Sequence, residues 1–450
     1  MAGSLPWVGV GPASCYNGRP FFPATLMQPI SIGVDFGTSN TVIALVGANG
    51  GSSVLKVTSR QGEGSALPSI LCFRPAEPNP RERPMSSAGV DAIADYISRT
   101  GPARLVQSMK SFLGSRAFID TKVFNHTYTL ETLIGTLLQH LYDATGAREL
   151  LKDAPLVIGR PIEFAGASPD DELAQTRLKA AFASAGHEAD RIGLEPEAAA
   201  YAFASRASGK HLVLVADLGG GTSDFSIVEV DADGAQPKLS PLAQTGIGIA
   251  GDRFDYQIVY NAVCPALGMG SLFQPETKKL PIPLWIYANF ASWHQLSMMN
   301  NRQTLRHITD ILRTTVDQEA FEGLVHVIRN EEGFTLFQAV SRVKQTLTAQ
   351  DTAKLTFKAG PIEIDRTVAR AEFEHWIADD LSRIEAMADE AVKIAGVNPA
   401  KLTRVFMTGG TALVPAVREL FAKKYGADKL VGGDEFSSVA QGLALMGAPR

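Results

Sequence analysis

Cysteine is scarce in this 450-residue chain, and the few cysteines present exclude a disulfide framework. Cys15, Cys72 and Cys264 form no CxxC pair, and any pairing leaves one of them over. Such usage is typical of a reducing compartment, so a cytoplasmic location is predicted. No apolar run approaches the ~20 residues that a membrane-spanning helix needs. A formal net charge of -5 argues against nucleic acid or an anionic membrane as the main partner.

Several nucleotide and metal motifs are absent as well. The chain has no GxxxxGK[ST], which excludes a P-loop. Its eight histidines show no HxxxH and no Cys/His cluster, so a transition-metal site is not expected. "GIGIAG" (246–251) matches GxGxxG, but no clear strand runs directly into it and no acid lies ~20 residues further on. A dinucleotide site is therefore not predicted.

Two similar strand–turn–strand segments are present instead. Residues 31–46, "SIGVDFGTSNTVIALV", predict a strand, a tight polar turn and a second strand. Residues 213–230, "VLVADLGGGTSDFSIVEV", repeat that plan, with carboxylates on either side of three glycines. An early and a middle copy of one hairpin indicate a chain of two similar α/β halves.

The glycines and acids of these turns together suggest a phosphate and a metal ion. A glycine triplet weakens a strand pair, but without Cβ atoms successive N–H groups can approach one anion. Thr38, Ser39 and Thr222 add hydroxyl donors. Carboxylates repel phosphate unless a cation such as Mg²⁺ lies between them. We therefore predict two phosphate-binding turns, each with a metal-facing acid, Asp35 and Asp217. Two ordinary hairpin turns with solvated acids are the alternative.

A third glycine site lies in "VFMTGGTALVP" (405–415). Gly409 and Gly410 follow a predicted strand and precede a helix. At this edge of an α/β sheet the backbone can lie flat against a base or ribose, which favours a nucleotide.

The predicted organisation has three parts. Residues 1–29 are rich in Gly and Pro and carry one charge, so they are predicted to be a disordered extension, with translation beginning at Met27. Residues 30–212 form the first predicted lobe and residues 213–450 the second. The second lobe includes a helical outer subdomain at about 246–397.

Taken together, these motifs resemble the ATPase domain of the heat-shock protein 70 chaperones, within the actin, sugar kinase and heat-shock superfamily. The similarity runs from about Ile30 to Ala448. It is carried by "IGVDFGTSNT", "KSFLG", "VIGRPIEF", "LEPEAAAYAF", "VADLGGGTSDFS" and "MTGGTALVP". The resemblance implies an actin-like α/β ATPase fold: two lobes, each with a duplicated mixed β-sheet flanked by helices.

The resemblance also implies roles for individual residues. Asp35 and Asp217 would hold Mg²⁺ through water, Lys110 in "SMKSFLG" would face the γ-phosphate, and Glu195 in "LEPEAAA" would orient the attacking water. Opening a helix near its positive end is an alternative role for Glu195. The predicted nucleotide contacts are Gly37, Thr38, Ser39, Asn40, Gly219, Gly220, Gly221, Thr222, Gly251, Lys344, Thr348, Gly409, Gly410 and Thr411.

The adenine site departs from the family pattern. Ser341 stands where the family has an acid, Gln345 where it often has an arginine, and Leu413 where another arginine would stack on the base. Loss of a planar cation removes stacking worth ~1 kcal/mol or more. Looser binding of adenine, or admission of another base, is expected.

The predicted function is an ATP-binding, slowly ATP-hydrolysing, chaperone-like protein. The chain ends at Arg450, so no peptide-binding domain is expected, and a separate client or co-chaperone is the expected partner. Three alternatives remain. An ATP-binding protein without turnover is one of them, because of the departures at the adenine site. A filament-forming protein can share "DFGTSNT". A small-molecule or sugar kinase would need an extra carboxylate beside the γ-phosphate, which no second motif recognisably supplies.

Overall fold

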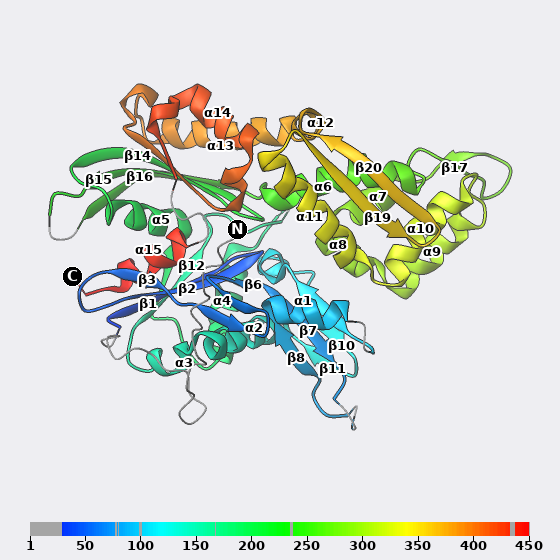
Figure 1. Cartoon of the computed structure of the whole chain (residues 1–450), viewed down its shortest axis with the longest axis horizontal. Coiled ribbons are helices and arrows are strands. Elements are labelled where there is room, and N and C mark those ends of the chain that lie inside the picture. Colours follow the sequence, from blue (N-terminus) through cyan, green and yellow to red (C-terminus); the bar gives the residue numbers. More distant parts are fainter. Residues whose placement is uncertain are drawn as a thin grey trace, which may run out of the picture.

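The computed structural model of the protein describes residues 29–76, 79, 81–98, 101–166, 168–234, 237–432 and 437–449. Figure 1 shows two halves, each built on a β-sheet with helices against it, and an arm of helices to one side. This arrangement confirms the predicted α/β class. Apart from Pro29, the predicted N-terminal extension and its start at Met27 lie outside the described residues.

The first half is built on a six-stranded sheet of order β13-β12-β1-β2-β3, with β6 paired to β2. β1 is antiparallel to β2 and parallel to β12, as the predicted early hairpin requires. Its strands are Ser31–Phe36 (β1), Asn40–Val46 (β2), Ser52–Val54 (β3), Leu67–Pro68 (β6), Leu156–Arg160 (β12) and Arg191–Leu194 (β13). Helices α2 (Leu130–Thr145), α3 (Ala147–Leu150) and α4 (Asp171–Ser184) accompany this sheet. Side-chain caps from Thr129 and Asp170 begin α2 and α4.

A smaller sheet extends this half outward. Its order is β8-β7-β9, formed by Met85–Ala88, Ile70–Arg74 and Arg104–Gln107, and helix α1 (Gly89–Ile97) packs on it. Two short pairs complete the region: β4 (Val57–Ser59) with β5 (Gly62–Gly64), and β10 (Thr121–Val123) with β11 (His126–Tyr128).

The second half is built on a five-stranded sheet of order β16-β15-β14-β21-β22. Its strands are Lys210–Leu218 (β14), Ser223–Asp231 (β15), Lys238–Ile247 (β16), Arg404–Thr408 (β21) and Leu430–Gly432 (β22). Helices α13 (Ala378–Ile394) and α14 (Pro415–Tyr425) cover one side of it (Figure 1).

β16 corrects one expectation, because a strand does run directly into the GxGxxG segment. Its sequence, KLSPLAQTGI, hid it because the buried and exposed positions do not alternate and Pro241 interrupts the ladder. Proline is tolerated at an edge strand, which β16 is. β16 pairs antiparallel to β15, so the segment does not belong to the parallel unit of a dinucleotide fold.

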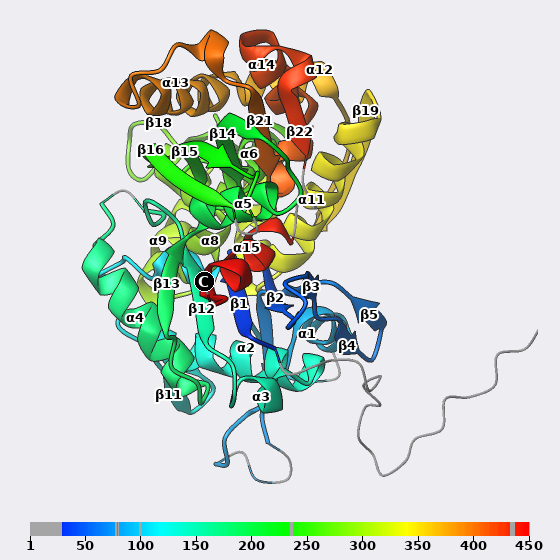
Figure 2. The same cartoon turned by 90° about the vertical axis from the view of Figure 1, so that its left-hand side faces the viewer.

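Two helices lie between the sheets (Figure 2): α5 (Glu195–Ala204) and α15 (Ser438–Gly447). They cross so closely that a Cβ on Gly442 would lie 1.7 Å from the carbonyl oxygen of Ala198. α15 also packs on β1, β2 and β12. The last helix, assigned by sequence to the second lobe, therefore supports the first sheet in space.

The outer part of the second half is mostly helical. Its helices are Gly251–Ile258 (α6), Leu284–Ala291 (α7), Trp293–Met299 (α8), Arg302–Leu312 (α9), Gln318–Arg329 (α10), Gly333–Ala349 (α11) and Arg370–Trp376 (α12). β17 (Leu272–Phe273) pairs with β18 (Leu280–Pro281), and β19 (Thr352–Ala359) pairs with β20 (Ile362–Ala369). β19 alternates exposed and buried residues, and the hairpin packs against α11. No helix in the described ranges is long and apolar enough to cross a bilayer.

Candidate functional site

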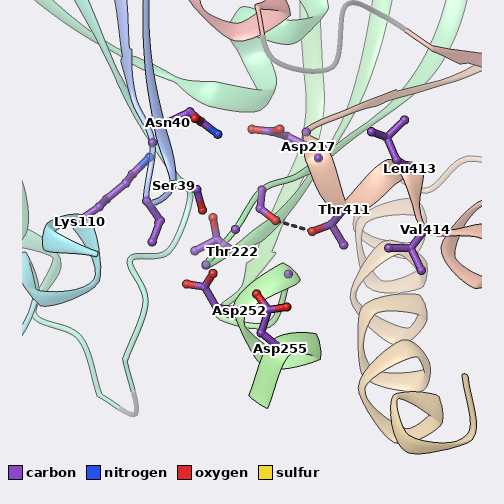
Figure 3. Close-up of a pocket in the computed structure, with 18 of the residues that line it drawn as sticks. Ser39, Asn40, Lys110, Asp217, Thr222, Asp252, Asp255, Thr411, Leu413 and Val414 are labelled. Atoms are coloured by element: carbon purple, nitrogen blue, oxygen red, sulfur yellow. Dashed lines mark hydrogen bonds between the residues drawn. The ribbon is translucent and has the colours of Figure 1, made fainter. Parts of the chain in front are cut away.

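The turn after β1 and the turn after β14 face each other in one cavity of about 370 Å³. Figure 3 shows Ser39 and Thr222 from these turns close together, with Asp217 above them and to the right. A Cβ on Gly220 would lie 2.6 Å from Ser39 Oγ, and one on Gly221 would lie 3.0 Å from Thr38 Oγ1. The hydroxyl-bearing first turn thus packs against the bare backbone of the second turn.

Both turns are closed by the same backbone hydrogen bond. The N–H of Gly37 donates to the carbonyl of Asn40, and the N–H of Gly219 donates to that of Thr222, each at 2.9 Å. The third glycine turn joins them, because Thr411 Oγ1 donates to the carbonyl of Gly219 at 2.6 Å (Figure 3). Three glycine-bearing turns from separate parts of the sequence therefore form one wall.

The two predicted acids occupy equivalent positions in the two hairpins. Asp35 is the penultimate residue of β1, and Asp217 is the penultimate residue of β14. Burial, with the charge of Glu195, raises the pKa of Asp35 to about 7, although Lys110 opposes the shift. Burial, Glu195 and Asp35 raise the pKa of Asp217 well above its usual value. The cleft therefore concentrates negative charge that a bound cation would relieve.

Lys110 enters the cleft from a short 3-10 turn, Met109–Phe112, that follows β9. Its Nζ donates to Glu195 Oε1 at 2.6 Å, and both side chains are buried. Burial alone would lower the pKa of Lys110, but the carboxylates of Glu195, Asp35 and Asp217 outweigh it and raise that pKa. Lys110 is thus a cation held in place by Glu195. Glu195 is also the first residue of α5, so its alternative role in opening that helix remains compatible with this geometry.

The acids fit a magnesium ion that keeps part of its water shell. Asp35, Asp217 and Glu195 line the cavity together with Lys110, and Lys344 lines it as a second cation. Among the described residues, no group of three or more His, Cys, Asp or Glu side chains is arranged to enclose a metal ion. Mg²⁺ commonly takes one or two carboxylates and completes its octahedron with water and phosphate oxygens, which this donor set allows.

The end of the cavity at which the sequence predicts the nucleoside is polar, and some of its polar groups are paired with one another. Lys344 on α11 donates to Asp255 Oδ2 at 2.8 Å and to the carbonyl of Gly251 at 3.0 Å. Thr348 Oγ1 donates to the carbonyl of Gln345 at 2.7 Å. The replacements noted in the sequence, Ser341, Gln345 and Leu413, all line the cavity. The departures thus lie in the pocket itself, and among the described residues no guanidinium lines this end of it.

The structure brings every predicted site residue to this one cavity. They are Asp35, Gly37, Thr38, Ser39, Asn40, Lys110, Glu195, Asp217, Gly219, Gly220, Gly221, Thr222, Gly251, Lys344, Thr348, Gly409, Gly410 and Thr411. What each of them binds remains a prediction.

Sequence reasoning missed two acids at the cavity, Asp252 and Asp255, in the first turns of α6. Figure 3 shows both carboxylates beside the glycine turns. They directly follow "GIGIAG", a segment whose glycine spacing matches only a dinucleotide motif. Their spacing of three residues at a helix start was the available signal.

The comparisons with known proteins agree with this geometry. A family model described as "Hsp70 protein" matches residues 31–265 and 326–448. The "Chaperone protein dnaK" of Guillardia theta is 25% identical over 405 residues, which is 86% of this chain. The "Chaperone protein DnaK" of Thermus thermophilus is 26% identical over 437 residues, which is 92% of this chain. The chain spans 55% and 60% of the lengths of these two relatives.

Proposed function

The chain belongs to the Hsp70 protein family and has its actin-like ATPase fold, and from this premise we propose that the cleft binds ATP with Mg²⁺ and hydrolyses it slowly. The observation that carries the proposal is the pair of glycine turns, which line one cavity with backbone free of side chains and with hydroxyl groups, beside Asp35 and Asp217. Backbone donors for phosphate next to carboxylates for a metal ion are what a magnesium-bound triphosphate requires.

In this proposal the two turns bind the phosphates from opposite sides, and Asp35 and Asp217 hold the metal ion through water. When bound, Mg²⁺ neutralises charge on the phosphate oxygens. Lys110 stabilises the charge that develops during transfer, because an ammonium group has three donors and Glu195 uses only one. Glu195 orients the attacking water.

The family and its DnaK relatives also support a chaperone-like role. We infer that the nucleotide state of the cleft controls contact with a separate client or co-chaperone protein. A reducing, cytoplasmic setting is part of this proposal, supported by the free thiols of the described cysteines, Cys72 and Cys264. Suppression of aggregation of an unfolded test protein, measured with ATP and with ADP, checks this role. Equal suppression in both states would contradict nucleotide control.

Single-turnover ATP hydrolysis is the direct test of the proposed chemistry. We expect Lys110→Ala to slow hydrolysis by roughly 10²–10³-fold, because it removes a preorganised charge from the reacting phosphate. The variant also leaves Glu195 buried without its partner, which destabilises a protein by about 3–5 kcal/mol. Lys110→Met combined with Glu195→Gln removes both charges, and we expect it to restore folding without restoring hydrolysis.

The matched control is Lys424→Met, which removes a lysine that pairs with Glu385 and Asp389 on the second half. Lys424 does not line the nucleotide cavity. We therefore expect the rate of hydrolysis to stay within twofold of the wild-type rate, which is roughly 0.4 kcal/mol in activation free energy. ATP binding is measured separately by calorimetry with and without Mg²⁺. A wild-type protein that binds no ATP would refute the proposed site, and unchanged hydrolysis in Lys110→Ala would show that another group supplies the cation.

A further inference from the structure

The outer end of the helical arm exposes large apolar side chains. We define this arm tip as residues 271–285 and 302–316, which contain β17, β18, the start of α7 and all of α9. Figure 1 shows β17 at the outer end of the arm, away from both sheets. The tip lies within residues 266–325, between the two stretches that the Hsp70 family model matches. A role of this surface therefore belongs to a part of the chain that the family model does not describe.

Three extended segments place an apolar row on one face of the tip. β17 and β18 pair so that Leu272 lies opposite Pro281. On the other side of β17, Phe273 pairs with Thr315, and the N–H of Val316 donates to the carbonyl of Leu272 at 2.8 Å. Residues opposite each other in antiparallel segments point to the same face. Val316, Leu272 and Pro281 therefore form a row, in which Val316 is 63% and Leu272 38% exposed.

Helix α7 adds two more exposed apolar side chains shortly after β18. Leu284 is 60% and Trp285 43% exposed, whereas Ile286 and Phe290 of the same helix are fully buried. The ring of Trp285 stacks on that of His307 from α9, with centroids 5.8 Å apart, so the indole is held at the surface. Apolar side chains that gather on an exposed surface mark an interaction site.

Basic side chains accompany these apolar groups. Lys278 and Lys279 lie in the connection from β17 to β18, and Arg302 and Arg306 lie one turn apart on α9, the second of them next to His307. None of these four forms an ion pair with any residue that the structure describes. Lysines and arginines number five in the tip and acids two, although the whole chain has a net charge of -5. Charges farther away than the Debye length of about 8 Å are largely screened, so a partner at the tip meets positive charge.

This combination of groups fits the surface of an anionic bilayer. Leucine, valine and tryptophan side chains are favoured at the boundary between headgroups and acyl chains. Unpaired lysine and arginine side chains attract anionic headgroups without first breaking an ion pair. A tip at the end of the arm can also reach a flat surface without contact from either half of the molecule (Figure 1). A protein partner would instead need a groove that encloses this projecting end.

We propose that the arm tip docks this protein on a bilayer that contains anionic lipids. The exposed apolar side chains enter the boundary between headgroups and acyl chains, and the four unpaired basic side chains contact the headgroups. Because few side chains enter the bilayer, the docking is reversible. The inference goes beyond the proposed function and does not depend on it, since no residue of the tip lines the nucleotide cavity.

The test uses the full chain and unilamellar vesicles of phosphatidylcholine, with or without about 30% phosphatidylglycerol. Bound protein is separated by flotation and quantified over a range of lipid concentrations. We expect the partition coefficient to be at least tenfold higher with phosphatidylglycerol, and to fall at least tenfold between about 0.1 M and 0.5 M NaCl. Tryptophan fluorescence should shift to shorter wavelength on binding. Trp285→Leu keeps an apolar side chain and should abolish that shift.

Matched variants show whether the tip carries the binding. Leu284→Ser removes an exposed apolar group, and Lys279→Glu reverses an unpaired charge, so each should lower the partition coefficient at least fivefold. Ile119→Ser and Lys122→Glu make the same kinds of change at exposed positions of the first half, and should alter it less than twofold. All four side chains are exposed, so we expect each variant to unfold at the wild-type temperature and to keep the wild-type rate of ATP hydrolysis.

The remaining outcomes overturn the inference. No binding to vesicles, or equal binding to neutral and anionic vesicles, would refute it. Equal losses in the tip variants and the controls would show that the tip is not the binding surface. If the wild type ignores vesicles but self-associates in sedimentation, and Leu284→Ser abolishes that association, the tip is a contact between copies of this chain. ATP binding is measured on the same preparations, and its absence would refute the proposed function while leaving this inference standing.

Discussion

The hairpins β1–β2 and β14–β15 follow the same backbone plan but differ in what their turns carry. Each closes its turn with one N–H···O bond of 2.9 Å, and each places an aspartate one residue before the end of its first strand. The first turn carries hydroxyls, Thr38 and Ser39, and the second turn is bare at Gly220 and Gly221. Because the turns pack face to face, side chains on one of them need empty space on the other.

A second difference lies opposite the acids. In the first hairpin Asp35 is paired across the strands with Val42, whereas in the second Asp217 is paired with another acid, Asp224. Asp224 is 1% exposed, and its Oδ1 accepts the N–H of Ile162 from the other half at 2.8 Å. The second hairpin therefore carries an extra buried carboxylate that joins the two halves. The two similar hairpins therefore differ where they meet across the cleft, and their turns are complementary in shape.

Neutralising the two equivalent acids one at a time should have the largest effect. We expect Asp35→Asn and Asp217→Asn each to weaken Mg²⁺-dependent ATP binding by roughly 10–100-fold, because each removes an acceptor for metal-bound water. Without nucleotide, Asp217→Asn should stabilise the protein more than Asp35→Asn, since Asp217 is close to three other acids. Calorimetric titration and thermal unfolding measure the two effects. Affinities unchanged in both variants would remove these acids from the metal site.

Substituting the equivalent glycines should separate the two turns next. A Cβ on Gly37 would lie 2.4 Å from the carbonyl oxygen of Asn40, whereas one on Gly219 would lie 3.4 Å from that of Thr222. The first contact is with backbone and cannot rotate away, so Gly37→Ala should cost about 1–3 kcal/mol. Gly219→Ala makes an ordinary contact and should stay within about 0.5 kcal/mol. Urea unfolding tests this, and equal losses would show that the turns are equally tight.

The sequence predicted the parts of the site that depend on local backbone chemistry. The glycine turns, their acids and the third turn could be read from strand patterns, and Lys110 and Glu195 from the family resemblance. All of them line one cavity. The α/β class followed from the same repeated hairpins. Each of these features is encoded by a short stretch of sequence, and folding places the stretches around the same cavity.

The rest depended on contacts that no local pattern encodes. Asp252 follows a segment whose glycine spacing matches a dinucleotide motif, and nothing in that local pattern places it beside Gly220. The return of α15 to the first sheet depends on its crossing with α5, at the close contact of Gly442 with Ala198. The close contact of Ser39 with Gly220 depends on how the two halves pack together. From the turn sequences alone, the only reason for the glycines is that they let a phosphate approach the backbone.

The extra acid of the second hairpin should make stability depend on pH. Burial raises the pKa of Asp224 to about 7, so between about pH 4 and pH 7 the folded state binds more protons than the unfolded state. The free energy of unfolding without nucleotide should therefore fall as pH rises through this window. Asp224→Asn keeps an acceptor for Ile162 and should reduce the slope, with a gain of at least about 1 kcal/mol at pH 8, or roughly 1 °C in Tm for a chain of this length. Thermal unfolding from pH 5 to pH 8 measures it, and a slope that survives the substitution would assign it to Asp35 and Asp217 instead.

The interlocking of the turns themselves should give the smallest effect, and a double-mutant cycle isolates it. Gly220→Ala forces a Cβ to within 2.6 Å of Ser39 Oγ, but a serine hydroxyl can turn to another rotamer, so we expect a cost of about 1 kcal/mol or less. Ser39→Gly removes the obstructing group and makes the first turn as bare as the second. If the glycines of the second turn are there to make room for the first, Gly220→Ala should cost almost nothing in the Ser39→Gly background. The two changes would then be non-additive by most of the single-mutant effect. If Gly220→Ala still lowers the free energy of unfolding in that background, the missing side chain at Gly220 is needed for the approach of a ligand and not for the fit between the two turns.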